Sequence, residues 1–130
     1  MIIENQTFDE ERALYGLKEL TVKNSLVKGE YLAWYSENLT LINCRIIGTQ
    51  PFCYCKNLVL KNCTMEDCDL AFERSTIQVE VRGKIDSVKN PLAGNITADL
   101  IDQIILEEEI CDKTKTKIIC RKEQDVEDKV

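Results

Sequence analysis

The side chains that could do chemistry in this 130-residue chain are carboxylates, tyrosines and thiols, because the sequence contains no histidine. Without histidine, neither a Ser-His-Asp nor a Cys-His arrangement can be assembled. Carboxylates gather at Glu66, Asp69 and Glu73, with Arg74 beside them, and a polysaccharide lyase or hydrolase would need such groups around a cleft. These acidic residues do not recur at equivalent positions along the chain, so we interpret them as a solvated surface rather than a catalytic site.

Two tyrosines offer a different kind of chemistry. Tyr35 and Tyr54 are nineteen residues apart and could together present a platform for a sugar ring. Tyrosine ladders are also ordinary stabilisers of sheets, so both interpretations stay open. The candidate ligand-binding residues are therefore Tyr35, Tyr54, Glu66, Asp69, Glu73 and Arg74.

The seven cysteines form an odd set that contains no Cys-x-x-Cys pair. Structural zinc sites are usually built on such pairs, completed by histidine or by further cysteines, so we predict no metal, and nothing indicates another cofactor. Several cysteines occupy positions that are small residues elsewhere in the chain. We expect buried, reduced thiols, with Cys44 and Cys63 as neighbours that form no disulfide.

Charge and hydropathy limit the possible partners. The net charge of −6 disfavours nucleic acid, and there is no apolar run long enough to span a bilayer. The opening residues, Met1 to Asn5, lack the basic and apolar segments of a secretion signal. We therefore expect a cytoplasmic protein whose partner is neither nucleic acid nor a membrane.

A repeat of nineteen residues determines how these side chains are positioned. The motif at 20–25 (LTVKNS) returns at 39–44 (LTLINC) and at 58–63 (LVLKNC), with a weaker copy at 77–81 (IQVEV). A fixed period of this size indicates a solenoid, in which a single repeat cannot bury its apolar face alone.

Each repeat alternates apolar and polar residues and therefore contains short strands. Leucine-rich repeats share part of this pattern, but their period is longer, and Pro51 and its neighbouring aromatics suit a strand better than a helix. A parallel β-helix is therefore favoured over a leucine-rich horseshoe. Trp34, Cys53 and Phe72 share one apolar column, so Trp34 is expected in the core. The residues that should be most buried are Leu39, Leu41, Leu58, Leu60, Ile46 and Phe72.

Asparagine recurs at positions 24, 43 and 62, directly after the repeated strand. Asparagine tolerates left-handed backbone angles, which suits a sharp corner. Stacked amides can also hydrogen-bond to one another along the axis. The column therefore predicts a structural ladder rather than a row for ligand recognition.

We divide the chain into three parts. Residues 1–19 form an N-terminal cap, as a polar helix or partial strand, and residues 20–105 form about four coils of the β-helix. Residues 106–130 contain a C-terminal strand and a charged, partly disordered tail. So short a stack has much end surface for its core, which predicts self-association as a homodimer.

The segment 5–15 and the copies at 37–41 and 56–60 resemble an uncharacterised bacterial family, a domain of unknown function. The resemblance covers residues 1 to about 105. It implies an all-β fold, a right-handed, single-stranded parallel β-helix of the pectin-lyase-like type with about nineteen residues per coil. Members of that family carry several more coils, so a function that resides in those coils would not be inherited. The resemblance supplies no catalytic residues.

These observations favour a non-enzymatic structural or interaction module of unknown function. The alternative is a carbohydrate-binding protein or a carbohydrate-active one similar to polysaccharide lyases and hydrolases. A fold analogy alone is weak support for that alternative.

Overall fold

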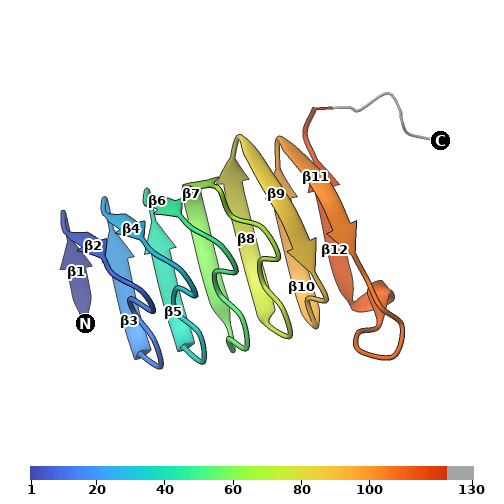
Figure 1. Cartoon of the computed structure of the whole chain (residues 1–130), viewed down its shortest axis with the longest axis horizontal. Helices are drawn as coiled ribbons and strands as arrows, with labels where there is room; N and C mark the ends of the chain where they lie inside the picture. The colour runs from blue at the N-terminus through green and yellow to red at the C-terminus, as the bar shows by residue number, and fades with distance from the viewer. Residues whose placement is uncertain (123–130) are drawn as a thin grey trace.

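The computed structural model describes residues 1–122, which consist almost entirely of parallel strands. The fold is an all-β solenoid of about 6 turns, with successive turns about 19 residues apart. The chain begins at one end of the stack, and the last strand lies at the other (Figure 1). This architecture confirms the parallel β-helix predicted from the repeat.

The solenoid has three sides. The long face is formed by β1 (Ile2–Glu4), β3 (Lys18–Lys23), β5 (Glu37–Ile42), β7 (Leu58–Glu66), β8 (Thr76–Arg82), β10 (Ala93–Ala98) and β12 (Thr116–Cys120). The second face is formed by β2 (Thr7–Asp9), β4 (Leu26–Lys28), β6 (Arg45–Ile47), the end of β7, β9 (Lys84–Lys89) and β11 (Leu100–Ile105). The turn face consists of the turn segments at 10–17, 29–36, 48–55 and 68–75. A short 3-10 helix (Lys113–Lys115) precedes β12.

Parallel pairing in register places equivalent residues directly above one another. On the long face, Thr21 pairs with Thr40, and Thr40 pairs with Val59. The same row continues through Gln78 to Asn95. Because side chains alternate between the two sides of a strand, this row faces outward and its neighbours on either side face the core.

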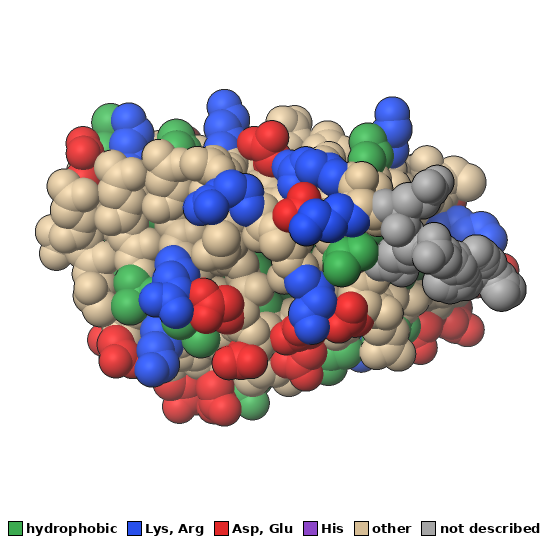
Figure 2. All heavy atoms as spheres, turned by 90° about the horizontal axis from the view of Figure 1, so that it is seen from above, with side chains coloured by type: hydrophobic (Ala, Val, Ile, Leu, Met, Phe, Trp, Pro, Cys, Tyr) green, Lys and Arg blue, Asp and Glu red, His purple; other side chains and the backbone are tan. Residues whose placement is uncertain are grey.

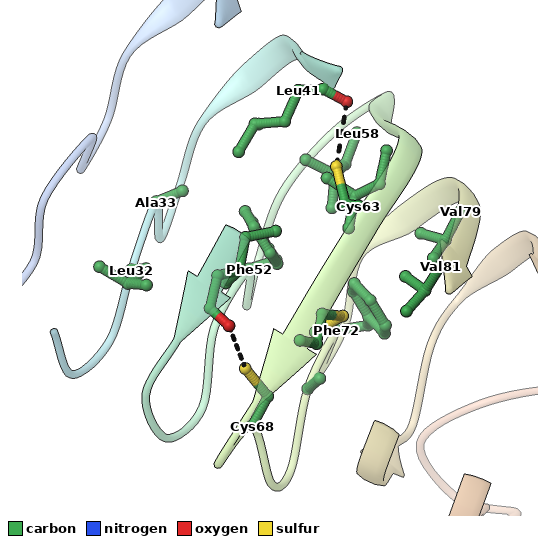
Figure 3. Close-up of a cluster of buried hydrophobic side chains, with 14 of the residues drawn as sticks. Leu32, Ala33, Leu41, Phe52, Leu58, Cys63, Cys68, Phe72, Val79 and Val81 are labelled. Atoms are coloured by element: carbon green, nitrogen blue, oxygen red, sulfur yellow. Dashed lines mark hydrogen bonds between the residues drawn. The ribbon is translucent and has the colours of Figure 1, made fainter. Parts of the chain in front are cut away.

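The inward columns form one continuous core. All of the residues expected to be most buried are buried: Leu39, Leu41, Leu58, Leu60, Ile46 and Phe72. Figure 3 shows side chains from successive turns packed between the faces, among them Leu41, Phe52 and Val79. The alternation seen in the sequence is therefore the alternation between core and solvent.

The seven cysteines are free thiols, and six of them are buried. Buried thiols donate to backbone carbonyls within the core: Cys63 Sγ donates to the Leu41 carbonyl at 3.4 Å (Figure 3), and Cys44 Sγ donates to the Val22 carbonyl at 3.5 Å. The adjacent Cys44 thiol and burial both raise the pKa of Cys63. Buried thiols in small-residue positions agree with the prediction from the sequence.

The asparagine column forms the corner between the long face and the second face. Asn24, Asn43 and Asn62 have φ values of 53°, 55° and 53°, all in the left-handed region. The Asn62 amide donates to the Asn43 side-chain oxygen. One amide bond of the predicted ladder is therefore present, and the left-handed asparagines turn the chain in these three coils. Figure 2 views this corner from above and shows basic and acidic side chains interspersed over it.

Two glycines permit the turns to approach one another on the turn face. A Cβ atom at Gly48 would lie 1.8 Å from the carbonyl oxygen of Gly29, and one at Gly29 would lie 2.2 Å from that of Glu10. No side chain fits at such distances, so each glycine is required by the turn stacked before it. Glu10 occupies the corresponding position of the first described turn.

The N-terminal segment is a turn of the solenoid and contains no helix. β1 pairs with β3, and β2 pairs with β4, both with an offset of nineteen residues. Thus Ile3 aligns with Val22, and Phe8 aligns with Val27. The estimate of about four coils is wrong, because this first turn and the last strands raise the number to about 6.

The expectation that Trp34 lies in the core is also wrong. The fourth turn is one residue longer than the third. Two hydrogen bonds of Cys55 show this difference: its partner in the turn before, Ser36, is nineteen residues away, whereas its partner in the turn after, Ser75, is twenty residues away. The insertion moves Phe72 out of the column of Trp34 and onto Phe52, with ring centroids 6.0 Å apart and 12° between the planes. Trp34 is left half-buried at the surface.

Within residues 1–122, no helix is long and apolar enough to cross a membrane. The predicted C-terminal strand corresponds to β12. The proposed disorder of the tail falls largely on residues 123–130, which lie outside the described part of the chain.

Candidate functional site

The acidic candidates lie apart and are occupied by other partners. Glu66 receives two hydrogen bonds from the Arg45 guanidinium, at 2.6 Å and 3.1 Å, and this contact lowers the pKa of Glu66 and raises that of Arg45. Asp69 accepts a hydrogen bond from the Thr49 hydroxyl. These carboxylates therefore do not converge on a common space.

Glu73 is directed toward a basic residue of the next turn. Its carboxylate lies 3.9 Å from Lys89 Nζ, and its side chain is largely covered. This carboxylate also contributes, after burial, to raising the pKa of Tyr54. Glu73 thus faces a lysine rather than another carboxylate.

The two candidate tyrosines stack on each other. The rings of Tyr35 and Tyr54 are 5.0 Å apart and nearly parallel, at 11°. Tyr15 from the first turn meets Tyr35 edge-on at 5.7 Å, which extends the ladder to three turns. The nineteen-residue spacing of Tyr35 and Tyr54 therefore predicted a real contact.

Trp34 fixes the position of this ladder, a role that the sequence did not indicate. Its ring meets Tyr54 edge-on at 5.4 Å and Tyr31 edge-on at 5.3 Å. Its indole Nε1 donates to the Gln50 carbonyl at 2.7 Å. Because a half-buried indole with a satisfied N–H has few alternative rotamers, it holds the Tyr54 ring in one orientation.

The tyrosine ladder forms one wall of a surface hollow that we call the aromatic hollow. Its volume is about 570 Å³. It brings together three of the six candidate residues, Tyr35, Tyr54 and Arg74, and excludes the three carboxylates. The lining residues are Tyr35, Tyr54, Cys55, Lys56, Asn57, Arg74, Thr76 and Leu92.

A second hollow of about 400 Å³, which we call the amide hollow, lies on the long face. Its polar lining consists of amides and hydroxyls without a charged side chain: Asn38, Thr40, Asn57, Thr76, Gln78 and Asn95. It also includes Ala93 and Gly94, whose small size lowers the surface beside their larger neighbours. A Cβ at Gly94 would lie only 1.7 Å from the Ile77 carbonyl oxygen, so a glycine is required there.

The two hollows are contiguous, because Asn57 and Thr76 line both. Within residues 1–122, no group of three or more Cys, Asp or Glu side chains could hold a metal ion. The sequence did not single out the amides, although Asn38 and Asn57 recur with the nineteen-residue period. They hydrogen-bond to each other at 3.0 Å, which shows that the period contains a second amide ladder.

Residues 1–119 match the model of a family described as Protein of unknown function (DUF3737). The chain belongs to this family. The match includes every residue that lines the two hollows. The comparisons with curated proteins and with solved structures gave no match.

Proposed function

We propose that this protein is a non-enzymatic interaction module, a pectin-lyase-like β-helix that acts in the cytoplasm as a homodimer. The positions of the acidic candidates support a non-enzymatic role. Glu66 is paired with Arg45, and Asp69 is bonded to Thr49, so neither faces the hollows. A glycoside hydrolase would need two carboxylates on either side of one bond.

The observation that carries the proposal is the strand edge at the N-terminal end of the stack. Among the described strands, β1 pairs only with β3, and β2 pairs only with β4. The Asn5 N–H and the Met1 carbonyl both bond toward β3. Because backbone groups alternate along a strand, the N–H and C=O groups of Ile2 and Glu4 point away from the stack and are free to pair with another strand.

Apolar side chains accompany this edge. Ile3 and Phe8 are only partly buried, although both pack against the core, and Ile2 is 58% exposed. A second copy related by a two-fold axis would place β1 antiparallel to its own counterpart and cover these residues. Such isologous dimers are the commonest soluble assemblies.

The residue at position 10 favours a closed dimer over a filament. A turn stacked in register on this end would need a glycine at position 10, as at positions 29 and 48. Glu10 places a side chain there instead. A copy that continued the solenoid head to tail would therefore clash, whereas a two-fold contact along β1 leaves that corner free.

Sedimentation equilibrium at micromolar concentration tests the proposal. The wild type should have twice its 14.9 kDa chain mass. Glu4→Pro removes the outward N–H without touching the bonds to β3 and should give a monomer, whereas Glu4→Ala keeps the N–H and should remain dimeric. A monomeric wild type would refute self-association, and a dimeric Glu4→Pro variant would refute the assigned edge.

A further inference from the structure

We propose that the aromatic hollow and the amide hollow together form a binding site for a neutral oligosaccharide. This site extends from the second turn of the stack to the sixth, away from β1 and β2, so it does not depend on self-association. It joins an apolar aromatic wall to a polar uncharged surface. A sugar presents the same two surfaces, the apolar C–H face of its ring and its hydroxyl groups.

The lining of the amide hollow matches hydroxyl groups in particular. A side-chain amide both donates and accepts hydrogen bonds, as does a sugar hydroxyl. Four amides and two threonine hydroxyls surround this hollow, and no charged side chain lines it. A charged ligand would leave its charge without a counter-ion there, which carries a high desolvation cost.

Several of these groups are free to bind. Gln78 and Asn95 are exposed, and neither side chain hydrogen-bonds to another side chain of residues 1–122. Asn57 uses one Nδ2 hydrogen on Asn38 and retains its second hydrogen and its carbonyl oxygen. Thr76 Oγ1 accepts from the Asn57 backbone N–H at 2.8 Å and keeps its own hydroxyl hydrogen. The amides are thus held in place and still have unused donors and acceptors.

The aromatic hollow supplies the stacking surface. The tyrosine ladder ends at Tyr54, because the equivalent residue of the next turn is Arg74 rather than another aromatic. The side of Tyr54 that faces this turn borders the hollow, and Leu92, 37% exposed, also lines it. Trp34 restrains the ring, so little ordering is required when a ligand binds.

The dimensions suit several sugar units rather than one. The lining of the amide hollow alone runs from Asn38 on β5 to Asn95 on β10, three turns further along the stack. At about 4.8 Å per turn, this span is on the order of 15 Å. Each hollow also falls within the roughly 300–1,000 Å³ that is typical of small-molecule sites. The ligand is therefore an extended chain that crosses the strands.

Two cations, Lys56 and Arg74, line only the aromatic hollow. These cations could pair with the carboxylates of an acidic sugar at that end. The experiment must therefore distinguish a neutral oligosaccharide from an acidic one. Titration of the ¹⁵N-labelled full-length protein with cellohexaose, xylohexaose and maltohexaose, each followed by NMR, covers the neutral class. Trigalacturonic acid supplies the acidic comparison. The side-chain amide signals of Gln78 and Asn95 report directly on the amide hollow.

The expected result is saturable binding of at least one neutral hexasaccharide with shifts of these amide signals. Tyr54→Asn should weaken the affinity about tenfold or more, and Gln78→Ala should weaken it about three- to tenfold, as for a lost hydrogen bond. Gln103→Ala is the matched control and should leave the affinity unchanged. Gln103 is an exposed amide on β11, and it lines neither hollow.

Three outcomes would overturn the proposal. The first is that none of the neutral oligosaccharides binds at millimolar concentration. The second is that only trigalacturonic acid binds and that Arg74→Gln abolishes its binding. The third is binding that Gln78→Ala does not change, which would place the ligand elsewhere. Because Gln78 is exposed, this variant folds as the wild type does and the measurement remains decisive even where Tyr54→Asn unfolds the protein.

Discussion

Replacing Gly48 by alanine tests how closely the turns are stacked. The new Cβ would lie 1.8 Å from the Gly29 carbonyl oxygen, whereas a carbon and an oxygen in contact need roughly 3.3 Å. Adjacent turns would have to separate by roughly 1.5 Å at this corner. That movement disrupts the hydrogen bond from Gly29 N to Ile47 O, now 3.0 Å long, at a cost of about 1 kcal/mol.

The backbone adds a second cost. Gly48 has a φ of +135°, a region almost closed to other residues, and the strain of a side chain there is about 1–3 kcal/mol. With the loss of packing around the separated turns, we expect Gly48→Ala to lower the free energy of unfolding by about 3–5 kcal/mol. This is a large part of the roughly 5–15 kcal/mol that holds a typical domain together.

Gly16→Ala provides the matched control. Gly16 also has a positive φ of +69°, but a Cβ there meets nothing within 4 Å. Its cost should be limited to the left-handed backbone, about 1–2 kcal/mol. Urea unfolding followed by circular dichroism gives both values. Equal losses for the two variants would show that the close approach of the turns costs nothing, which would refute the stacking geometry at this corner.

Three further predictions concern the core, the thiols and one surface carboxylate. Leu60→Ala should lose about 2–5 kcal/mol in urea unfolding because Leu60 is 1% exposed, whereas Val59→Ala, on the outward side of the same strand, should lose much less; a loss below about 1 kcal/mol for Leu60→Ala would contradict the strand register. The urea midpoint should be the same with and without reductant, since the cysteines are free thiols, and a lower midpoint on reduction would reveal a disulfide. The Gly83 N–H and the Arg121 guanidinium lower the pKa of Asp99 below 3.8, so this carboxylate stabilises the fold above that pH and loses its effect as the pH falls through its folded value. Asp99→Asn should therefore lower the melting temperature at neutral pH, and the difference from wild type should shrink as the pH falls below 3.8; a constant difference would exclude the linkage.

The parts of the fold that the sequence predicted are those set by in-register stacking. When turns stack directly, each inward position must be filled at the same place in every turn, so Leu41, Leu60 and Val79 appear as one column. The corner at Asn43 and Asn62 recurs for the same reason. The sequence therefore repeats with the same period as the structure. The positions of the core residues, of the asparagine corner and of the buried thiols could be predicted from that period.

The first turn was predicted to be a cap rather than a coil, because only some of its positions match the repeat. Ile3 and Phe8 occupy the columns of Val22 and Val27, but a terminal turn packs on one side only and tolerates polar residues elsewhere. Its composition therefore looked helical. The prediction that Trp34 lies in the core was wrong for a different reason. A strict spacing of nineteen residues aligns Trp34 with Phe72, and the inserted residue of the fourth turn breaks this alignment.

The amide hollow could not have been predicted from the residue types that compose it. Gln78 and Asn95 are exposed polar residues, and in a sequence such residues look the same whether they face bulk water or line a concave surface. The hollow depends on Ala93 and Gly94 having almost no side chain beside the larger Thr76. The depth of the hollow arises because side chains at equivalent positions differ in size between neighbouring turns. This difference in size can be recognised only after the turns are aligned.

The two hollows lie where the repeat is imperfect, and this has a physical cause. A strictly repeating turn would continue the tyrosine ladder past Tyr54 and the amide ladder past Asn57, and both faces would then be flat. Instead, Arg74 takes the position that follows Tyr54 and ends the first ladder, and the change to Thr76 and then Ala93 ends the second. Stacking supplies the rigid frame, because each turn is fixed by its neighbours. The departures from the repeat then create recessed surfaces whose side chains are already held in place, which is what a binding site requires of its scaffold.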